Sequence, residues 1–244
     1  MRRLLARLLP ARRGASEGET GDLADRAAAM AAEAGFLGVP LEGFAATGKK
    51  QLDALMTLGL KSESKLLDIG CGCLRGGYWL IHFLAPGRYF GIEPHRKRVE
   101  LGLRYLIEPD VLVEKRPRFD GNEAFDTSVF RERFDFFLAS SIWSHASKPQ
   151  IERMLDGFLR DTREEGVFMT SYVPPAGPED DYRGREWVGT SHTCDVPGVI
   201  SHSLKWIGQA CTRRRLEVAR LAGHELDGQP WLVVRRAAGA SSPG

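Results

Sequence analysis

The chain of 244 residues is 43% hydrophobic and 27% charged, which is typical of a soluble globular protein with one sizeable core. No apolar run approaches the roughly 18 residues that a membrane-spanning helix needs. The formal net charge is +2, but the first thirteen residues hold five arginines and no acid, and subtracting these five leaves −3 for the rest. A body of that sign argues against a nucleic-acid partner, which attracts basic surfaces.

Residues 1–21 are predicted to form a basic, disordered arm ahead of the folded part. A helix that lies on a membrane surface is the alternative for this arm, and the less favoured one. We expect no secretory signal peptide, because Pro10 interrupts the stretch and an unbroken apolar core of about 7 residues is missing.

Two helices are predicted in the next segment, residues 22–64, which we interpret as a helical N-terminal cap. The alanine-rich stretch LADRAAAMAAEAG favours a helix that ends at Gly35. A second, amphipathic helix is predicted in KKQLDALMTLGL, with Leu52, Leu55 and Leu60 on one face.

Strands and helices alternate along residues 65–236, the main predicted domain, and residues 237–244 are expected to form a flexible tail. Apolar runs predict strands at 65–69, 88–93, 116–119, 134–140, 166–173, 216–221 and 231–236. Helical periodicity predicts helices at 76–84, 95–107, 149–160 and 201–212. This alternation predicts an α/β fold: a doubly wound, mostly parallel, Rossmann-like sheet with helices on both faces. Two neighbouring strands at the end predict an antiparallel finish.

The stretch KLLDIGCGCLRGG, residues 65–77, places an acid and then four glycines at the end of the first strand. Glycines let a backbone turn sharply and come close to a ligand. Ligands of open parallel sheets bind beyond the carboxyl ends of the strands, so this turn is the first candidate site. Glu93 ends the second strand, where one carboxylate can accept both hydroxyls of a ribose. The two features predict a nucleotide-like ligand.

Asp68, the acid at the mouth of the turn, decides between two ligand classes. A dinucleotide brings a pyrophosphate, which favours backbone N–H groups and a helix dipole and which Asp68 would repel. S-adenosylmethionine has a ribose but no phosphate, and its sulfonium and ammonium groups are positive. The residues therefore favour S-adenosylmethionine over NAD.

At this point the sequence resembles the class I S-adenosylmethionine-dependent methyltransferases, in particular bacterial members that act on small molecules. LLDIGCGCLRGG looks like their first motif, YFGIEP like their second, and FDFFLASSIWSHA like the fourth strand and the segment leading to the acceptor. The resemblance spans about residues 45–236. One departure is Leu74, where many members have a further glycine.

The resemblance implies a methyltransferase that binds S-adenosylmethionine. The cofactor-binding residues that it implies are Asp68, Gly70 and Gly72 around the methionine end and Glu93 on the ribose. We assign the adenine contact to Asn122 and Phe125, near the end of the third strand, and a further cofactor contact to Ser140, at the end of the fourth.

The methyl acceptor requires a second group of residues. A hydroxyl acceptor must lose a proton, for which an imidazole is the usual base at neutral pH. His145 lies five residues past Ser140 and is the candidate catalytic base. A histidine that only braces the loop is the alternative, and His192 and His202 compete for the role.

The connection VPPAGPEDDYRGREWVGTSHTCDVPG is too long to be idle in a compact domain. Its aromatic, acidic and basic residues suit a polar ring such as a sugar, through stacking and hydrogen bonds. The candidate substrate contacts are Trp143, Tyr172, Tyr182, Glu186 and Trp187. Packing of the loop onto the domain is the alternative role for each of them.

The four cysteines form no disulfide framework, because Cys71 and Cys73 lie inside the glycine turn, and we expect a reducing, cytoplasmic location. The CxC pair together with His192 and Cys194 matches no familiar zinc spacing, so no metal site is predicted.

Together the residues predict an S-adenosylmethionine-dependent O-methyltransferase for a hydroxyl of a small polar molecule, a sugar or glycan precursor. Methylation of a carboxylate or an amine in secondary metabolism is the alternative within the class. Outside the class stand a nicotinamide-dependent reductase, which Asp68 disfavours, and a non-catalytic cofactor-binding scaffold.

Overall fold

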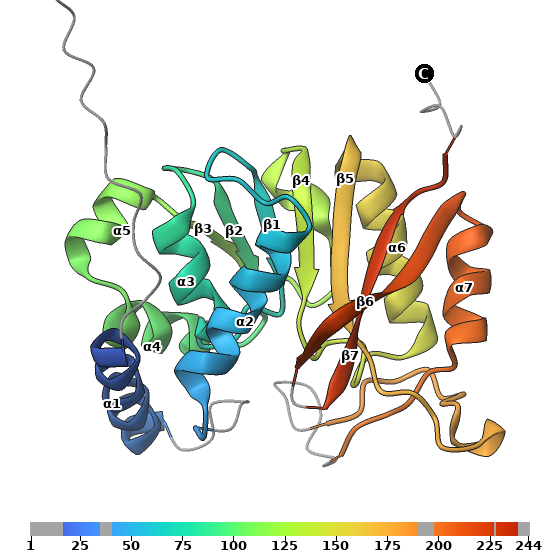
Figure 1. Cartoon of the computed structure of the whole chain (residues 1–244), viewed down its shortest axis with the longest axis horizontal. Helices are drawn as coiled ribbons and strands as arrows, with labels where there is room; N and C mark the ends of the chain where they lie inside the picture. The colour runs from blue at the N-terminus through green and yellow to red at the C-terminus, as the bar shows by residue number, and fades with distance from the viewer. Residues whose placement is uncertain (1–16, 35–40, 190–197, 227, 239–244) are drawn as a thin grey trace, which may run out of the picture.

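The computed structural model describes residues 17–34, 41–189, 198–226 and 228–238 of the chain. Its centre is a seven-stranded sheet with the order β3-β2-β1-β4-β5-β7-β6 (Figure 1). The strands are β1 (Leu66–Ile69), β2 (Tyr89–Ile92), β3 (Arg118–Asp120), β4 (Phe134–Ala139), β5 (Thr162–Ser171), β6 (Leu216–Leu226) and β7 (Gln229–Arg236). Strands β1 to β5 pair in parallel, and β7 pairs antiparallel with both β5 and β6. The predicted parallel sheet with an antiparallel finish is confirmed.

Helices cover both faces of the sheet, as the alternating pattern predicts. They are α1 (Glu17–Ala34), α2 (Phe44–Thr57), α3 (Arg75–Phe83), α4 (Arg96–Leu106), α5 (Pro109–Lys115), α6 (Lys148–Asp161) and α7 (Leu204–Thr212). One cluster of buried side chains joins α1 to α4 with one face, and a second cluster joins α6 and α7 with the other. Leu66 belongs to the first cluster and Leu67 to the second, because successive residues of a strand point to opposite faces.

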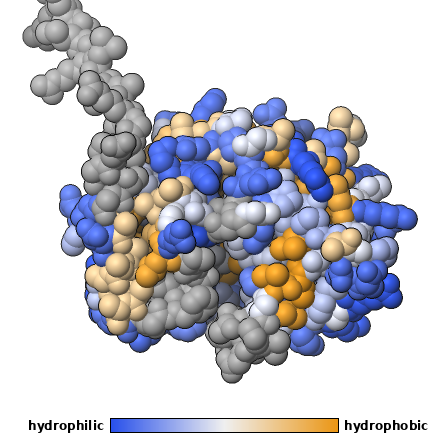
Figure 2. Space-filling model, turned by 60° about the horizontal axis from the view of Figure 1, so that its bottom comes forward, coloured by the Kyte–Doolittle hydropathy of each residue, from blue (hydrophilic) through white to orange (hydrophobic). Residues whose placement is uncertain are grey.

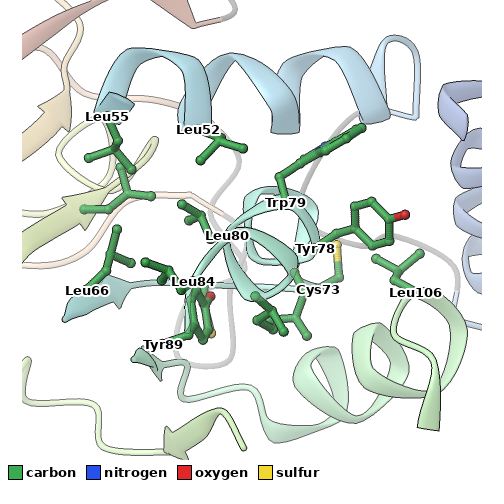
Figure 3. Close-up of a cluster of buried hydrophobic side chains, with 14 of the residues drawn as sticks. Leu52, Leu55, Leu66, Cys73, Tyr78, Trp79, Leu80, Leu84, Tyr89 and Leu106 are labelled. Atoms are coloured by element: carbon green, nitrogen blue, oxygen red, sulfur yellow. The ribbon is translucent and has the colours of Figure 1, made fainter. Parts of the chain in front are cut away.

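Helices α2 and α3 pack closely in the first cluster (Figure 3). Leu52 of α2 points toward Leu80 of α3 across the space between them. A Cβ on Gly48 would lie 2.1 Å from the carbonyl oxygen of Arg75, so only glycine permits this approach of the two helices. The segment predicted as a cap, residues 22–64, therefore shares its core with the strands that follow it.

Several boundaries differ from the sequence prediction. Helix α1 begins at Glu17, inside the stretch predicted as a disordered arm, and residues 1–16 lie outside the described part. Helix α5 was not predicted, and β6 continues to Leu226 rather than ending at Leu221. Among the described residues, no helix has both the length and the apolar composition needed to cross a membrane.

Candidate functional site

The candidate site lies at the edge of the sheet where β1 to β5 end, the lower edge in Figure 1, which we call the carboxyl edge. Figure 2, with the bottom of the molecule turned forward, shows hydrophobic residues gathered on this face among hydrophilic ones. The loops that follow β1, β2, β3, β4 and β5 all leave the sheet here, so their side chains converge at this edge.

The turn after β1 has a strongly bent backbone. Gly70 and Gly72 have φ of +74° and +54°, a region that glycine enters without steric cost. The N–H groups of Gly70 and Cys71 both donate to the carbonyl of Ile92, at 2.8 and 3.2 Å, which ties the turn to the end of β2. Among the described residues, a Cβ on Gly72 would meet within 4 Å only the Gly70 carbonyl oxygen. The turn therefore leaves room for a ligand beside Gly72.

Leu74, the departure from the family motif, ends this turn with φ of +65° and caps α3. Its side chain is fully buried and packs against two glycines, since a Cβ on Gly77 or on Gly102 would lie 2.9 Å from it. The leucine at this position therefore packs into the core beneath the turn.

The carboxyl group of Asp68 is buried in the floor of the turn. Asp68 is 3% exposed, and its Oδ2 accepts a hydrogen bond of 2.8 Å from the hydroxyl of Tyr89. Burial raises the pKa of Asp68 to about 7, the negative charge of Glu93 adds to this, and the Tyr89 hydrogen bond opposes it. Asp68 has no ion-pair partner within the described part of the chain. A positively charged ligand at this place would favour its ionised form.

Glu93 joins the ends of two strands through its carboxylate. The side chain follows β2 and is 6% exposed as a residue. Its Oε2 accepts the N–H of Gly72 at 3.0 Å, and its Oε1 accepts the N–H of His95 at 2.9 Å. Each carboxylate oxygen offers two acceptor positions, so the described part of the chain leaves one open on each oxygen of Glu93. The two remaining positions match a pair of neighbouring hydroxyl groups.

Asn122, assigned to adenine, shapes the loop after β3. Its Nδ2 donates to Oδ1 of Asp120 at 2.7 Å and to the carbonyl of Asp126 at 3.2 Å, and its Oδ1 accepts the N–H of Asp126 at 2.8 Å. Phe125 in this loop has φ of +57°, and its ring stacks on Trp187 at a centroid distance of 6.4 Å. The amide of Asn122 is thus occupied by the loop itself.

The exit from β4, where the sequence predicts Ser140, Trp143 and His145 as site residues, turns at Ser141, a residue that the sequence analysis did not name. Ser141 has φ of +56°, and its N–H donates to Oγ of Ser171 at 2.8 Å. Ile142 leans on the glycine turn, since a Cβ on Gly70 would lie 2.1 Å from its Cδ1. Oγ of Ser140 is buried and has no hydrogen-bond partner among the described residues. A serine that adopts a left-handed conformation leaves no signal in the sequence.

His145 follows this turn and has an ordered, half-buried ring. The ring stacks on Trp187 at 5.4 Å, and Nδ1 lies 2.8 Å from the carbonyl oxygen of Val188. A carbonyl oxygen only accepts, so Nδ1 carries the hydrogen and Nε2 of the neutral ring holds a lone pair. Burial lowers the pKa of His145, against an opposing effect of the carbonyls of Val188 and Gly198. The imidazole is therefore neutral at neutral pH, as a general base must be.

The long loop after β5 supplies three of the predicted substrate contacts. The hydroxyl of Tyr182 donates to the carbonyl of Glu186 at 3.1 Å, and Glu186 is exposed. Nε1 of Trp187 donates to the carbonyl of Gly189 at 3.1 Å, and its ring stacks on both Phe125 and His145. Trp187 thus contacts the candidate base directly.

Trp143 and Tyr172, the other predicted substrate contacts, lie in the core beneath the site. Both are 0% exposed, so neither offers a surface that a substrate could touch in this conformation. Trp143 packs edge-on against Phe168 at 5.7 Å, and the hydroxyl of Tyr172 accepts a hydrogen bond from Arg220 at 2.9 Å.

His202, a competitor for the role of base, is also 0% exposed, and its Nε2 donates to the carbonyl of Ala146 at 2.9 Å. His192 and Cys194 lie outside the described residues. Cys71 and Cys73 are buried free thiols, and burial raises the pKa of both. Within the described ranges, no three histidine, cysteine or acidic side chains gather as they would around a metal ion.

Comparison with solved structures places this arrangement among known folds. No protein-family model and no curated protein sequence matches the chain. The DhpI complex with S-adenosylhomocysteine has a TM-score of 0.58 at 14% identity and covers 92% of this chain and 100% of that one.

Two further solved methyltransferase structures are similar in fold to this chain. Magnesium protoporphyrin IX methyltransferase (ChlM) from Synechocystis PCC 6803, with bound S-adenosylmethionine, has a TM-score of 0.60 at 14% identity, covering 87% of this chain and 90% of that one. The glycopeptide N-methyltransferase MtfA with S-adenosylhomocysteine has a TM-score of 0.56 at 13% identity, covering 78% and 89%. The chain therefore has the fold of the class I S-adenosylmethionine-dependent methyltransferases.

Proposed function

We propose that the chain transfers a methyl group from S-adenosylmethionine to a hydroxyl of a small polar molecule, a sugar or glycan precursor. One observation carries the proposal: the neutral imidazole of His145 lies at the same edge of the sheet as Asp68 and Glu93. When bound, S-adenosylmethionine supplies the methyl group and a positive sulfonium.

The chemistry of the carboxyl edge fits this cofactor. The open acceptor positions of Glu93 suit the two ribose hydroxyls, and the space beside Gly72 suits the chain of the methionine end. The carboxyl of Asp68, which has no ion-pair partner among the described residues, suits a cation better than a pyrophosphate, so the proposal favours S-adenosylmethionine over NAD. In this proposal Asn122 holds the loop that faces the adenine and does not itself bind the base.

The base in the proposal is Nε2 of His145. The hydrogen bond from Nδ1 to Val188 fixes the tautomer, and the stacked ring of Trp187 fixes the plane of the imidazole. A ring held in this way takes the acceptor's proton without first losing one of its own. General bases of this kind contribute roughly 10²–10⁴-fold to rate.

The polar character of the surroundings supports a small polar acceptor. Tyr182 and Glu186 stay in the proposal as substrate contacts, since both lie on the loop next to the base. Ser140 is half-buried as a residue and stays in the proposal as a cofactor contact, but its buried hydroxyl is not proposed as the contacting atom. Trp143 and Tyr172 are not retained, because they are fully buried. The buried free thiols Cys71 and Cys73 support a reducing, cytoplasmic setting.

An amine acceptor is the second candidate, because the solved structures of similar fold include MtfA, a glycopeptide N-methyltransferase. An amine can lose its proton to solvent before the transfer, so it has less need of the His145 imidazole.

The first experiment is calorimetry of the purified chain with S-adenosylmethionine, S-adenosylhomocysteine and NAD. We expect binding of the first two only, and tighter binding of NAD would refute the proposal. The second is a methyl-transfer assay with labelled cofactor against matched sets of sugars, amines and carboxylates. Transfer to sugar hydroxyls supports the O-methyltransferase, whereas transfer to amines alone selects the second candidate.

A further inference from the structure

A polar link joins the β6–β7 hairpin to the turn at the exit of β4. Gln229 is the first residue of β7, and its Oε1 accepts a hydrogen bond of 3.0 Å from Oγ of Ser171. Its Nε2 lies 3.5 Å from Oγ of Ser141, as donor to acceptor. Oγ of Ser171 accepts the N–H of Ser141 at 2.8 Å. Gln229, Ser171 and Ser141 therefore form a closed ring of three contacts.

The ring of contacts holds a backbone conformation that is unfavourable by itself. Ser141 has φ of +56°, where the Cβ of an L-residue comes too close to the backbone. Such residues persist only where the surrounding structure holds them in place. Ser171 is 0% exposed, so water does not replace it as the acceptor of the Ser141 N–H. The left-handed turn at Ser141 thus depends on its partners from β5 and β7.

The Ser141 turn determines where the next residues lie. The carbonyl of Ile142 accepts the N–H groups of His145 and Ala146, at 3.0 and 2.9 Å, so this carbonyl fixes the backbone of the base. The side chain of Ile142 packs on Gly70 of the candidate cofactor turn. A change in the φ of Ser141 would therefore move His145 relative to that turn.

We infer that Gln229 is a positioning residue for methyl transfer, which holds the Ser141 turn and through it aligns His145 with the cofactor. Gln229 acts from the C-terminal hairpin, and contact with cofactor or acceptor is not part of its role. The inference rests on the proposed function of His145 as the base. In-line transfer is sensitive to such alignment, because a displacement of about 1 Å can cost up to 10²-fold in rate.

The test compares Gln229→Leu with Gln209→Leu, a matched control at an exposed position on α7. We expect Gln229→Leu to lower kcat about tenfold, an effect of misalignment, with KM and the Kd of S-adenosylmethionine changed less than about twofold. Amide hydrogen exchange at Ser141 should become faster, because Oγ of Ser171, which accepts its N–H, is no longer held by Gln229. The control variant should change none of these quantities.

A second substitution separates positioning from a general loss of structure. Glycine adopts a positive φ without help, so in a Ser141→Gly background Gln229→Leu should lower kcat less than about twofold. Ser171→Ala should have the same effects as Gln229→Leu, both in the wild type and in the Ser141→Gly background. If Gln229→Leu does not fold, Ser171→Ala takes its place in the test. An equal loss in both backgrounds, or unchanged exchange at Ser141, would overturn the inference. If the wild-type chain transfers no methyl group, the proposed function fails, and the exchange measurement still decides whether the link holds the turn.

Discussion

Replacing Asp68 by asparagine should stabilise the unliganded protein at alkaline pH. The carboxyl of Asp68 is buried beside Tyr89, Cys71 and Glu93, and its pKa is raised from 3.8 to about 7. A folded-state pKa above that of the unfolded chain means that the folded protein keeps the proton longer as the pH rises. Ionising Asp68 therefore costs stability progressively from about pH 4 upward, and the cost is complete above about pH 7.

The separation between 3.8 and about 7 corresponds to roughly 4 kcal/mol, at 1.36 kcal/mol for each pKa unit. Asparagine keeps the shape of Asp68, can accept the hydrogen bond from Tyr89, and cannot ionise. The free energy of unfolding of Asp68→Asn should thus exceed that of the wild type by up to about 4 kcal/mol at pH 8.5. At pH 4 the two proteins should differ by less than about 1 kcal/mol.

Urea denaturation at several pH values measures the difference in the free energy of unfolding, with Asp110→Asn, at an exposed position on α5, as the control. Calorimetry in buffers of different ionisation enthalpy measures the protons released when the cofactor binds. A cation beside Asp68 lowers its pKa, and near pH 7 about half of the Asp68 carboxyls are protonated, so cofactor binding by the wild type should release up to about half a proton and Asp68→Asn should release fewer. The reasoning is refuted if wild type and Asp68→Asn show the same dependence of stability on pH.

Further outcomes are expected at three positions. Glu93→Gln should raise the Kd of S-adenosylmethionine about 10- to 100-fold, because a charged hydrogen bond is lost. Calorimetry against the exposed control Glu100→Gln measures this, and an unchanged Kd would contradict it. His145→Ala should lower kcat roughly 10²–10⁴-fold with little effect on cofactor affinity. Because burial lowers the pKa of His145, the wild-type rate should fall toward acid pH with an apparent pKa below 6.5, and a flat pH–rate profile would exclude it as the base. Gly70→Ala should lower the free energy of unfolding by about 1–3 kcal/mol in chemical denaturation, because φ of Gly70 is +74° and the new Cβ would lie 2.1 Å from Ile142. Unchanged stability would contradict the turn geometry.

The sheet could be predicted because its strands are short apolar runs between turn residues. The segments read as strands at 65–69 and 134–140 correspond to β1 and β4, which are buried on both faces and so carry few polar residues. The glycine turn could be predicted equally well, since its backbone needs residues without a Cβ. Helix α5 was missed because none of its residues is buried, and an exposed helix has no apolar period to detect.

The candidate site was predicted in part, for a reason that lies in side-chain direction. Aromatic residues at the exit of a strand suit a pocket and a core equally well, and the sequence does not say which way they point. Trp143 and Tyr172 turn into the core, whereas Trp187 stacks on His145. Trp143 comes two residues after the left-handed turn at Ser141, and no sequence pattern predicts that turn.

Strand β7 is the last strand along the chain, yet it lies between β5 and β6 in the interior of the sheet. During synthesis, the backbone N–H and C=O groups on one edge of β5 therefore stay unpaired until residues 229–236 have left the ribosome. The contact between Gln229 and Ser141 forms only at that moment as well. A chain that stops before β7 would thus not be a slower enzyme: it would expose an open strand edge to its neighbours and aggregate.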